Sequence, residues 1–249
     1  MLIRNSSNTL TVPDTKRLWF ISDLHLNHRK LCTSYPEHFE QTRKYATIEE
    51  MNEDLIKNWN EVVAKDDVVI FLGDFSLGTP HAQLAQFFLS TMEKLNGEIY
   101  CVFGNHDYEL RRRLNKIGEE SVFVDYMVID YKGRQYFAQH YDFDEDKHNA
   151  KDALEHDLLD ETKELVFVHG HTHSSRQIST FYNNSLVQNC VCEDVRYFPI
   201  PANMLLGSCI DIVDKVSAQC ELEEDVMHHC FMEGEGNEQT VGQGDKQDS

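Results

Sequence analysis

Five short motifs along the chain carry side chains that can hold metal ions or move protons. In chain order they are Asp23-Leu24-His25, Gly73-Asp74, Gly104-Asn105-His106-Asp107, the single His140 and Gly170-His171-Thr172-His173. A set that mixes oxygen and imidazole donors suits Mn, Fe, Zn or Ni better than Mg or Ca. The motifs supply enough ligands for two divalent cations and leave one histidine over, which predicts the dinuclear site of a hydrolase.

Each motif alone also has an ordinary structural explanation. Asp23 or Asp74 could belong to a simple turn at the end of a strand, and Asn105 could cap the first turn of a helix. A single histidine such as His140 is commonly a surface or core residue. The metal-site interpretation is favoured because the five motifs occur together, in one order, at the ends of expected strands.

Four short apolar runs are expected to form the strands that position these motifs. They cover residues 18–21, 68–72, 99–103 and 165–168, and each stops just before a motif. Runs of this length, rich in β-branched and aromatic residues, indicate buried strands. Open α/β sheets bind ligands beyond their strand ends, so the motifs are expected to gather there.

Helices and further strands fill the intervals between these runs. Thr47 and Glu50 form a capping-box pattern at the start of a helix whose apolar residues recur at helical spacing. The other expected elements are a helix over 84–95, a hairpin over 126–139 that delivers His140, a polar helix over 149–161, and returning strands over 177–182 and 185–192. Strands and helices alternate first and strands dominate later, which fits two packed sheets flanked by helices.

The order of the five motifs resembles that of the calcineurin-like metallophosphoesterase superfamily over residues 18–200. Three stretches are also similar to a small bacterial and phage phosphoesterase group, namely WFISDLHLNHRKL at 19–31, RKYATIEEMNEDLIKNWN at 43–60 and NCVCEDVRYFPI at 189–200. The resemblance implies an α/β fold, in which an αββα sandwich of two mixed β-sheets is flanked by helices.

The resemblance also implies a role for each motif residue. Asp23, His25, Asp74 and His173 would form one metal site, and Asp74, Asn105, His140 and His171 the other. Asp74 would bridge the two divalent ions, for which manganese is expected and Fe, Zn or Ni are alternatives. His106 would contact the phosphoryl group or protonate the leaving group, with Asp107 orienting it. General chemistry agrees, because a histidine beside cations can be a general acid when a carboxylate supports its protonated form.

The activity that the resemblance implies is that of a metal-dependent phosphoric ester hydrolase. The enzyme would act on a phosphodiester or phosphomonoester of a small or nucleotide-like substrate, by in-line attack of a metal-bound hydroxide. Two alternatives stay open: a nuclease-type phosphodiesterase acting on short RNA or DNA, and a metal-binding scaffold with weak or no catalysis. The presence of His106 argues against the scaffold.

Three further residues are candidates for substrate binding. His28 and Arg29 follow the first motif in the same loop, where a substrate contact and a solvated position are both open. Arg43 matches an arginine of the smaller group and could pair with a phosphate through its two-pronged guanidinium, or lie on the surface.

Composition and charge limit the partners. The net charge of −20 disfavours extensive duplex nucleic-acid binding and attachment to an anionic membrane. No apolar run reaches membrane-spanning length. The seven cysteines are an odd number without a paired framework, which suits a reducing compartment and predicts a cytoplasmic location.

The same features predict three segments. Residues 1–16 are polar and are expected to be a flexible N-terminal arm, and residues 17–220 to form the metallophosphoesterase domain. Residues 221–249 carry nine acids and one lysine, and so are expected to be an acidic, disordered tail.

Overall fold

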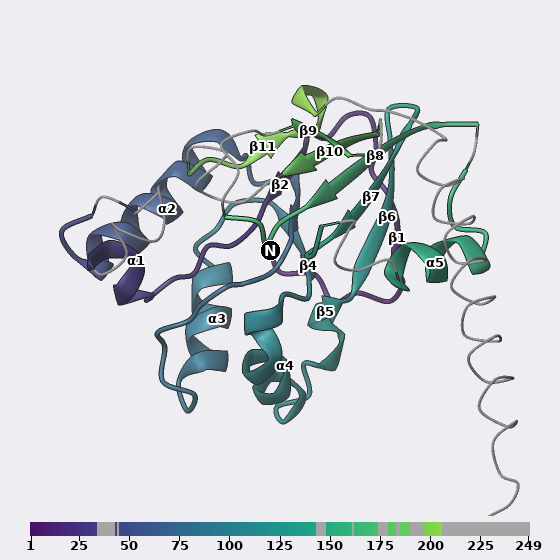
Figure 1. Cartoon of the computed structure of the whole chain (residues 1–249). Coiled ribbons are helices and arrows are strands. Elements are labelled where there is room, and N and C mark those ends of the chain that lie inside the picture. Colours follow the sequence, from purple (N-terminus) through teal and green to yellow (C-terminus); the bar gives the residue numbers. More distant parts are fainter. Residues whose placement is uncertain are drawn as a thin grey trace, which may run out of the picture.

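The structure is a computed structural model of the chain. It describes residues 1–33, 43, 45–142, 148–160, 162–173, 179–182, 185–189 and 197–205, with the backbone alone at 179–182 and 185–189. Two β-sheets pack against each other and helices cover the outside (Figure 1). Phe20 of one sheet and Tyr136 of the other have ring centroids 5.5 Å apart in the shared core.

The described elements follow one another as strands and helices in the first half and mainly as strands in the second. The strands are β1 (Thr9–Thr11), β2 (Leu18–Ile21), β3 (Val68–Phe71), β4 (Glu98–Val102), β5 (Phe123–Val124), β6 (Tyr126–Tyr131), β7 (Arg134–Gln139), β8 (Glu164–His169), β9 (Ser179–Tyr182), β10 (Ser185–Asn189) and β11 (Ile200–Pro201). The α-helices are α1 (Arg29–Thr33), α2 (Ile48–Val62), α3 (Leu84–Met92), α4 (Tyr108–Asn115) and α5 (His148–Glu155). Short 3-10 turns lie at Asn105–Asp107, Glu120–Val122 and Ala202–Met204.

Both sheets are mixed, which confirms the expected α/β sandwich. Sheet A has the order β11-β2-β3-β4-β5, with β2 to β5 parallel and β11 antiparallel to β2. Sheet B has the order β1-β6-β7-β8-β10-β9, with antiparallel pairs at β6–β7 and β9–β10 and parallel pairs elsewhere. Ile21, Phe71 and Cys101 are aligned across β2, β3 and β4. The loops that carry the first three motifs therefore leave sheet A side by side.

Helices α2, α3 and α5 form in the regions that the sequence predicts, but α3 ends at Met92 instead of 95 and α5 ends at Glu155 instead of 161. Thr47 caps α2, because its Oγ1 accepts a hydrogen bond from the Glu50 N–H at 3.1 Å. Met51, Leu55 and Trp59 are buried on the inner face of this helix. On the other side of the molecule, α5 packs its small residues against sheet B, in a second apolar cluster (Figure 1).

The expectation of a flexible arm over residues 1–16 is wrong. Strand β1 pairs in parallel with β6 at the edge of sheet B, and Leu2 forms a bridge with Ile99. Leu2 and Val12 are both buried in the main core. Two isolated apolar residues and a short edge strand give little periodicity, so the sequence pattern hides this segment. The predicted acidic tail lies outside the described residues and stays a prediction.

Candidate metal centre

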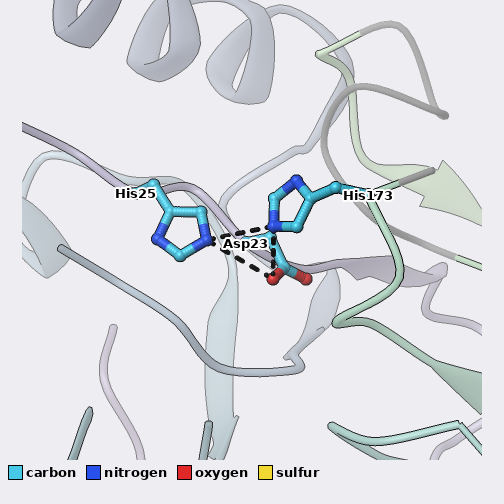
Figure 2. Close-up of side chains that lie close together, drawn as sticks. All are labelled: Asp23, His25 and His173. Atoms are coloured by element: carbon cyan, nitrogen blue, oxygen red, sulfur yellow. Dashed lines mark hydrogen bonds and ion pairs between the residues drawn. The ribbon is translucent and has the colours of Figure 1, made fainter. Parts of the chain in front are cut away.

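The predicted ligands come together where the two sheets meet, beyond the carboxyl ends of their strands. Sheet A supplies Asp23 and His25 after β2, Asp74 after β3 and Asn105 after β4, whereas sheet B supplies His140 after β7 and His171 and His173 after β8. Figure 2 shows Asp23, His25 and His173 converging from the two sides. The parallel register of the strands explains why residues so distant in sequence become neighbours.

Four of these ligand candidates have left-handed backbone conformations that residues other than glycine rarely adopt. The φ angles are 58° at Asp23, 44° at His25, 59° at Asp74 and 68° at His171. Each such position costs on the order of 1–3 kcal/mol and persists only where the surroundings enforce it. Main-chain hydrogen bonds supply part of that restraint, because the Asp23 N–H donates to Gly73 O at 2.9 Å and the His25 N–H to Asp74 O at 3.0 Å.

Two glycines allow the loops after β3 and β4 to touch. A Cβ atom on Gly104 would lie 2.3 Å from Asp74 Oδ1, and one on Gly73 would lie 2.5 Å from Gly104 N. Gly73 also has a φ of +92°. Any larger residue at either position would push Asp74 out of place.

The first ligand group consists of Asp23, His25 and His173. His25 Nε2 lies 3.1 Å from His173 Nε2, and Asp23 Oδ1 lies 3.6 Å and 3.2 Å from these two nitrogens (Figure 2). Asp23 Oδ1 is buried and accepts no hydrogen bond from the described residues. An orphaned buried carboxylate oxygen facing two imidazole nitrogens is costly on its own and fits a bound cation.

The second ligand group consists of Asp74, Asn105, His140 and His171. Asn105 Oδ1 lies 2.7 Å from His140 Nε2 and 3.1 Å from His171 Nδ1. Asp74 Oδ2 lies 3.6 Å from His140 Nε2 and 3.6 Å from His25 Nε2 of the first group. Asp74 therefore stands between the two groups, where a carboxylate shared by two ions would have to be.

Burial favours the neutral, metal-binding form of His25 and His140. Burial lowers the pKa of His140 to about 4 and also lowers the pKa of His25. His140 Nδ1 lies 2.7 Å from the carbonyl oxygen of Leu72, which only accepts, so the proton is on Nδ1. Nε2 is then left with its lone pair directed at Asp74 and Asn105, as a metal ligand requires.

The two buried carboxylates, Asp23 and Asp74, oppose one another electrostatically. Burial, followed by the charges of Asp23 and Asp107, raises the pKa of Asp74. Burial also disfavours ionised Asp23, but the imidazoles of His173 and His25 hold the pKa of Asp23 well below its usual range. The pair therefore retains a proton when no cation neutralises it.

His106 lies beside the ligands with a side chain that reaches the surface. Its side chain is 40% exposed, and its Nε2 is 4.0 Å from Asp74 Oδ2. The His106 N–H donates to Asp74 Oδ1 at 2.9 Å, which turns the other carboxylate oxygen toward the histidines. His106 can thus orient Asp74 through its main chain while its ring stays partly exposed.

Asp107 does not occupy the position that the resemblance implies. Its carboxylate accepts hydrogen bonds from three main-chain N–H groups, those of Asp74 at 2.8 Å, Phe75 at 3.0 Å and Gly104 at 3.1 Å. Among the described residues, the ion pair of the His106 ring is with Asp74 and not with Asp107. Adjacent residues of a tight 3-10 turn point in different directions, so Asp107 joins the loops after β3 and β4 instead of orienting His106.

The three candidate substrate contacts lie in different surroundings. His28 is half-buried, with its ring centroid 5.8 Å from that of His25, and burial lowers the pKa of His28 to about 4. Arg29 is exposed at the start of α1. Arg43 is fully buried, and its guanidinium donates to the carbonyl oxygens of Asp23 and Leu24. The expectations of a phosphate contact or a surface position for Arg43 are therefore wrong.

Sequence reasoning missed two features around the site. Tyr141 packs its ring against His140 and His171, at centroid distances of 5.2 Å and 4.9 Å. Asn27, with a φ of 64°, receives a hydrogen bond on its Oδ1 from Asn52 Nδ2 at 2.6 Å, which ties the loop after β2 to α2. Two sequence features could have indicated them: Tyr141 directly follows His140, and Asn27 lies in the loop that carries the first motif.

Comparisons with known proteins agree with this geometry. A family model described as calcineurin-like phosphoesterase matches residues 16–198, and the chain belongs to that family. The Gene 66 proteins of Mycobacterium phages D29 and L5 are 31% and 28% identical to it over 180 and 178 residues, covering 67% and 65% of this chain and 83% and 79% of theirs. These phage relatives fit the small bacterial and phage group.

Two further matches carry less functional information. An uncharacterized protein of Methanocaldococcus jannaschii is 38% identical over 128 residues, a match that covers 50% of this chain and 58% of that protein. A solved structure of a protein of unknown function from Aquifex aeolicus superposes with a TM-score of 0.51 and 20% identity, covering 76% of this chain and 97% of its own. The structural match supports the fold alone.

Family membership and the ligand groups together support a metal-dependent phosphoester hydrolase. Among the described residues, no helix combines the length and the apolarity needed to cross a membrane.

Proposed function

We propose that this chain is a dinuclear metal-dependent phosphoesterase that hydrolyses a mono- or diester of a small or nucleotide-like substrate. The observation that carries the proposal is the position of Asp74 Oδ2, which is 3.6 Å from a nitrogen of each ligand group, His25 Nε2 and His140 Nε2. Such a shared carboxylate is what holds two ions close together in hydrolytic sites of this kind.

The positions of the ligand residues support their division between two ions. Asp23, His25, Asp74 and His173 would hold the first, and Asp74, Asn105, His140 and His171 the second. The donor set of oxygens and imidazoles favours manganese, with Fe, Zn or Ni as alternatives. When bound, such ions neutralise the phosphoryl oxygens and acidify water.

The protein's own contribution to the reaction is to position groups and to move a proton. Asp74 is oriented by the His106 N–H, and Asp107 fixes the loops that carry both residues. The partly exposed His106 ring lies beside the ligands, where it can donate a proton to the leaving oxygen of an ester. Burial lowers the pKa of His106, and the negative charge of Asp23 opposes this shift by favouring the protonated ring.

The overall charge supports a small substrate. A net charge of −20 opposes the approach of a long polyanion, because such binding depends on many basic contacts. Arg111 and Arg112, which belong to the chain's arginine triplet, pair with Asp125 and Glu109 on the protein itself. A compact ester that enters only the metal centre avoids this repulsion.

A metal-loaded assay tests the proposal. The purified chain would be saturated with Mn²⁺ and assayed with p-nitrophenyl phosphate and bis(p-nitrophenyl) phosphate, together with Asp74→Asn and the remote control Asp125→Asn. We expect metal-dependent turnover in the wild type and in Asp125→Asn, and loss of turnover in Asp74→Asn. Absence of hydrolysis of both esters by the metal-loaded wild type would overturn the proposal.

A further inference from the structure

The loop after β2 presents two carbonyl groups to a single buried side chain. Arg43 donates from Nη2 to Asp23 O at 2.6 Å and from Nη1 to Leu24 O. These carbonyls belong to the turn in which Asp23 has a φ of 58°. A buried carbonyl without a donor is costly, so Arg43 stabilises a main chain that would otherwise relax.

Arginine is suited to this task for a geometric reason. Its planar guanidinium presents several N–H groups in a rigid fork, so one side chain can bind two neighbouring carbonyls at once. A lysine ammonium is a compact point charge without that planar set of donors, so it would hold the two carbonyls less firmly. Arg43 is among the largest fully buried side chains, and a buried cation persists only when it is well hydrogen-bonded.

The Arg43 side chain also contacts helix α2. Arg43 Nη1 lies 3.8 Å from Met51 Sδ, so the side chain is packed between the ligand loop and α2.

We propose that Arg43 is a positioning residue for the first metal group, fixing Asp23 and His25 through the main chain between them, and that it makes no contact with substrate. The inference rests on the proposed metal site. It differs from a substrate contact in a measurable way, because a positioning residue changes metal affinity whereas a phosphate ligand changes the KM of the metal-saturated enzyme.

The test compares Arg43→Lys and Arg43→Gln with the matched control Arg134→Gln. Arg134 also bonds a main-chain carbonyl, that of Leu205 at 3.4 Å, but it pairs with Glu164 away from the ligands. Mn²⁺ binding would be measured by calorimetry, with thermal melting to verify folding. We expect Arg43→Gln to weaken Mn²⁺ binding by about 10–100-fold, the usual effect of losing a group that orients ligands. Arg43→Lys should lose less, and Arg134→Gln nothing.

Single-site backgrounds show which ion responds. His140→Ala leaves the first group intact, and His25→Ala leaves the second. We expect Arg43→Gln to weaken the remaining Mn²⁺ in the His140→Ala background, and to change it little in the His25→Ala background. Equal loss in both backgrounds would overturn the assignment to the first group.

Two further measurements separate the alternatives. Arg43→Ala supplemented with methylguanidinium should regain Mn²⁺ affinity, a rescue that a general loss of packing would not show. Wild-type Mn²⁺ affinity in both Arg43→Lys and Arg43→Gln, or a raised KM at saturating Mn²⁺ with unchanged metal affinity, would overturn the inference. Absence of esterase activity would count against the proposed function but would leave these binding measurements interpretable.

Discussion

The two sheets contribute different chemistry to the metal centre. Sheet A supplies both buried acids, Asp23 and Asp74, whereas sheet B supplies only histidines from its described strand ends. The acids stand in loops that are hydrogen-bonded to one another through the Asp107 carboxylate and the main chain. Sheet A thus holds both acids beyond the carboxyl ends of its strands, here called the acid edge. Sheet B brings histidines to them from the corresponding strand ends, here called the histidine edge.

In two hydrogen bonds between the sheets, a group of sheet B donates to an acceptor of sheet A. The His171 N–H donates to Asp23 Oδ2 at 2.9 Å, and His140 Nδ1 donates to Leu72 O at 2.7 Å. A Cβ atom on Gly170 would lie 2.0 Å from Ser22 Oγ, so sheet B comes very close to the loop of sheet A. The histidines are therefore oriented by sheet A, and ions between the edges would link the two sheets.

The largest effect should follow from removing an acid of sheet A. Asp74→Ala should lose most of both ions, because one carboxylate serves both groups, and turnover should fall by on the order of 10³-fold or more. His140→Ala removes a neutral ligand of sheet B and should weaken one ion first. Elemental analysis after metal loading and a steady-state assay measure both outcomes. Full retention of two ions in Asp74→Ala would refute the shared carboxylate.

The next largest effect should be on catalysis by His106, which follows β4 of sheet A, and not on metal binding. His106→Ala should keep both ions and the fold but lose about 10²–10⁴-fold in kcat, as expected for a positioned acid. The loss should be smaller for p-nitrophenyl esters, whose leaving group needs little protonation. Rates on poor and good leaving groups, with metal content as the control, check this. An equal loss for both kinds of ester would argue against proton donation by His106.

The place where the ligands meet could be predicted from the sequence, because parallel strands in register end on the same side of a sheet. The apolar runs end in step, so Asp23, Asp74 and Asn105 had to leave neighbouring strands on the same side. The hairpin was predicted for a similar reason, and its turn at Lys132 and Gly133 has φ angles of 51° and 76°. Periodicity and turn chemistry are local, so they can be recognised without the fold.

The parts that could not be predicted depend on the direction in which a side chain leaves a loop. Asp107 was expected to face His106, but in the 3-10 turn it faces three main-chain N–H groups. Arg43 was expected to meet phosphate or solvent, and it is buried against Asp23 and Leu24. Neither position follows from residue type or spacing, because each is set by loops that approach from elsewhere in the sequence.

Removing the ions tests whether they link the two sheets. Mn²⁺ at about 100 times its dissociation constant should stabilise the folded chain by about 2.7 kcal/mol per ion, since it binds only the assembled site. For a chain of this size that is roughly 5–10 °C in melting temperature. His173→Ala should show a smaller shift. Thermal melting with chelator and with added Mn²⁺ measures the difference, and an unchanged melting temperature would contradict the link.

Proton release should distinguish the acid edge from the histidine edge. The raised pKa of Asp74 means that its carboxyl holds a proton at neutral pH in the metal-free chain. Binding Mn²⁺ should displace this proton, so affinity should rise with pH until the raised pKa is passed. Calorimetry in two buffers of different ionisation enthalpy counts the protons. Counted per Mn²⁺ ion that still binds, the release should be absent in Asp74→Asn, whereas persistence in that variant would assign it to another group.

The smallest effect should come from the N-cap of helix α2, which is not part of the acid edge. Thr47 Oγ1 accepts the Glu50 N–H at 3.1 Å and is the side-chain cap of α2. Thr47→Ala should lower the free energy of unfolding by about 1 kcal/mol, because it exposes an unpaired helix N–H. Mn²⁺ affinity should stay the same, since α2 reaches the ligand loop through Asn52 and Met51, which lie further along the helix. Denaturant unfolding and Mn²⁺ titration of the same sample check both halves. A parallel loss of metal affinity would show that helix stability and ligand geometry are coupled, and the distinction between a rigid acid edge and the elements around it would fail.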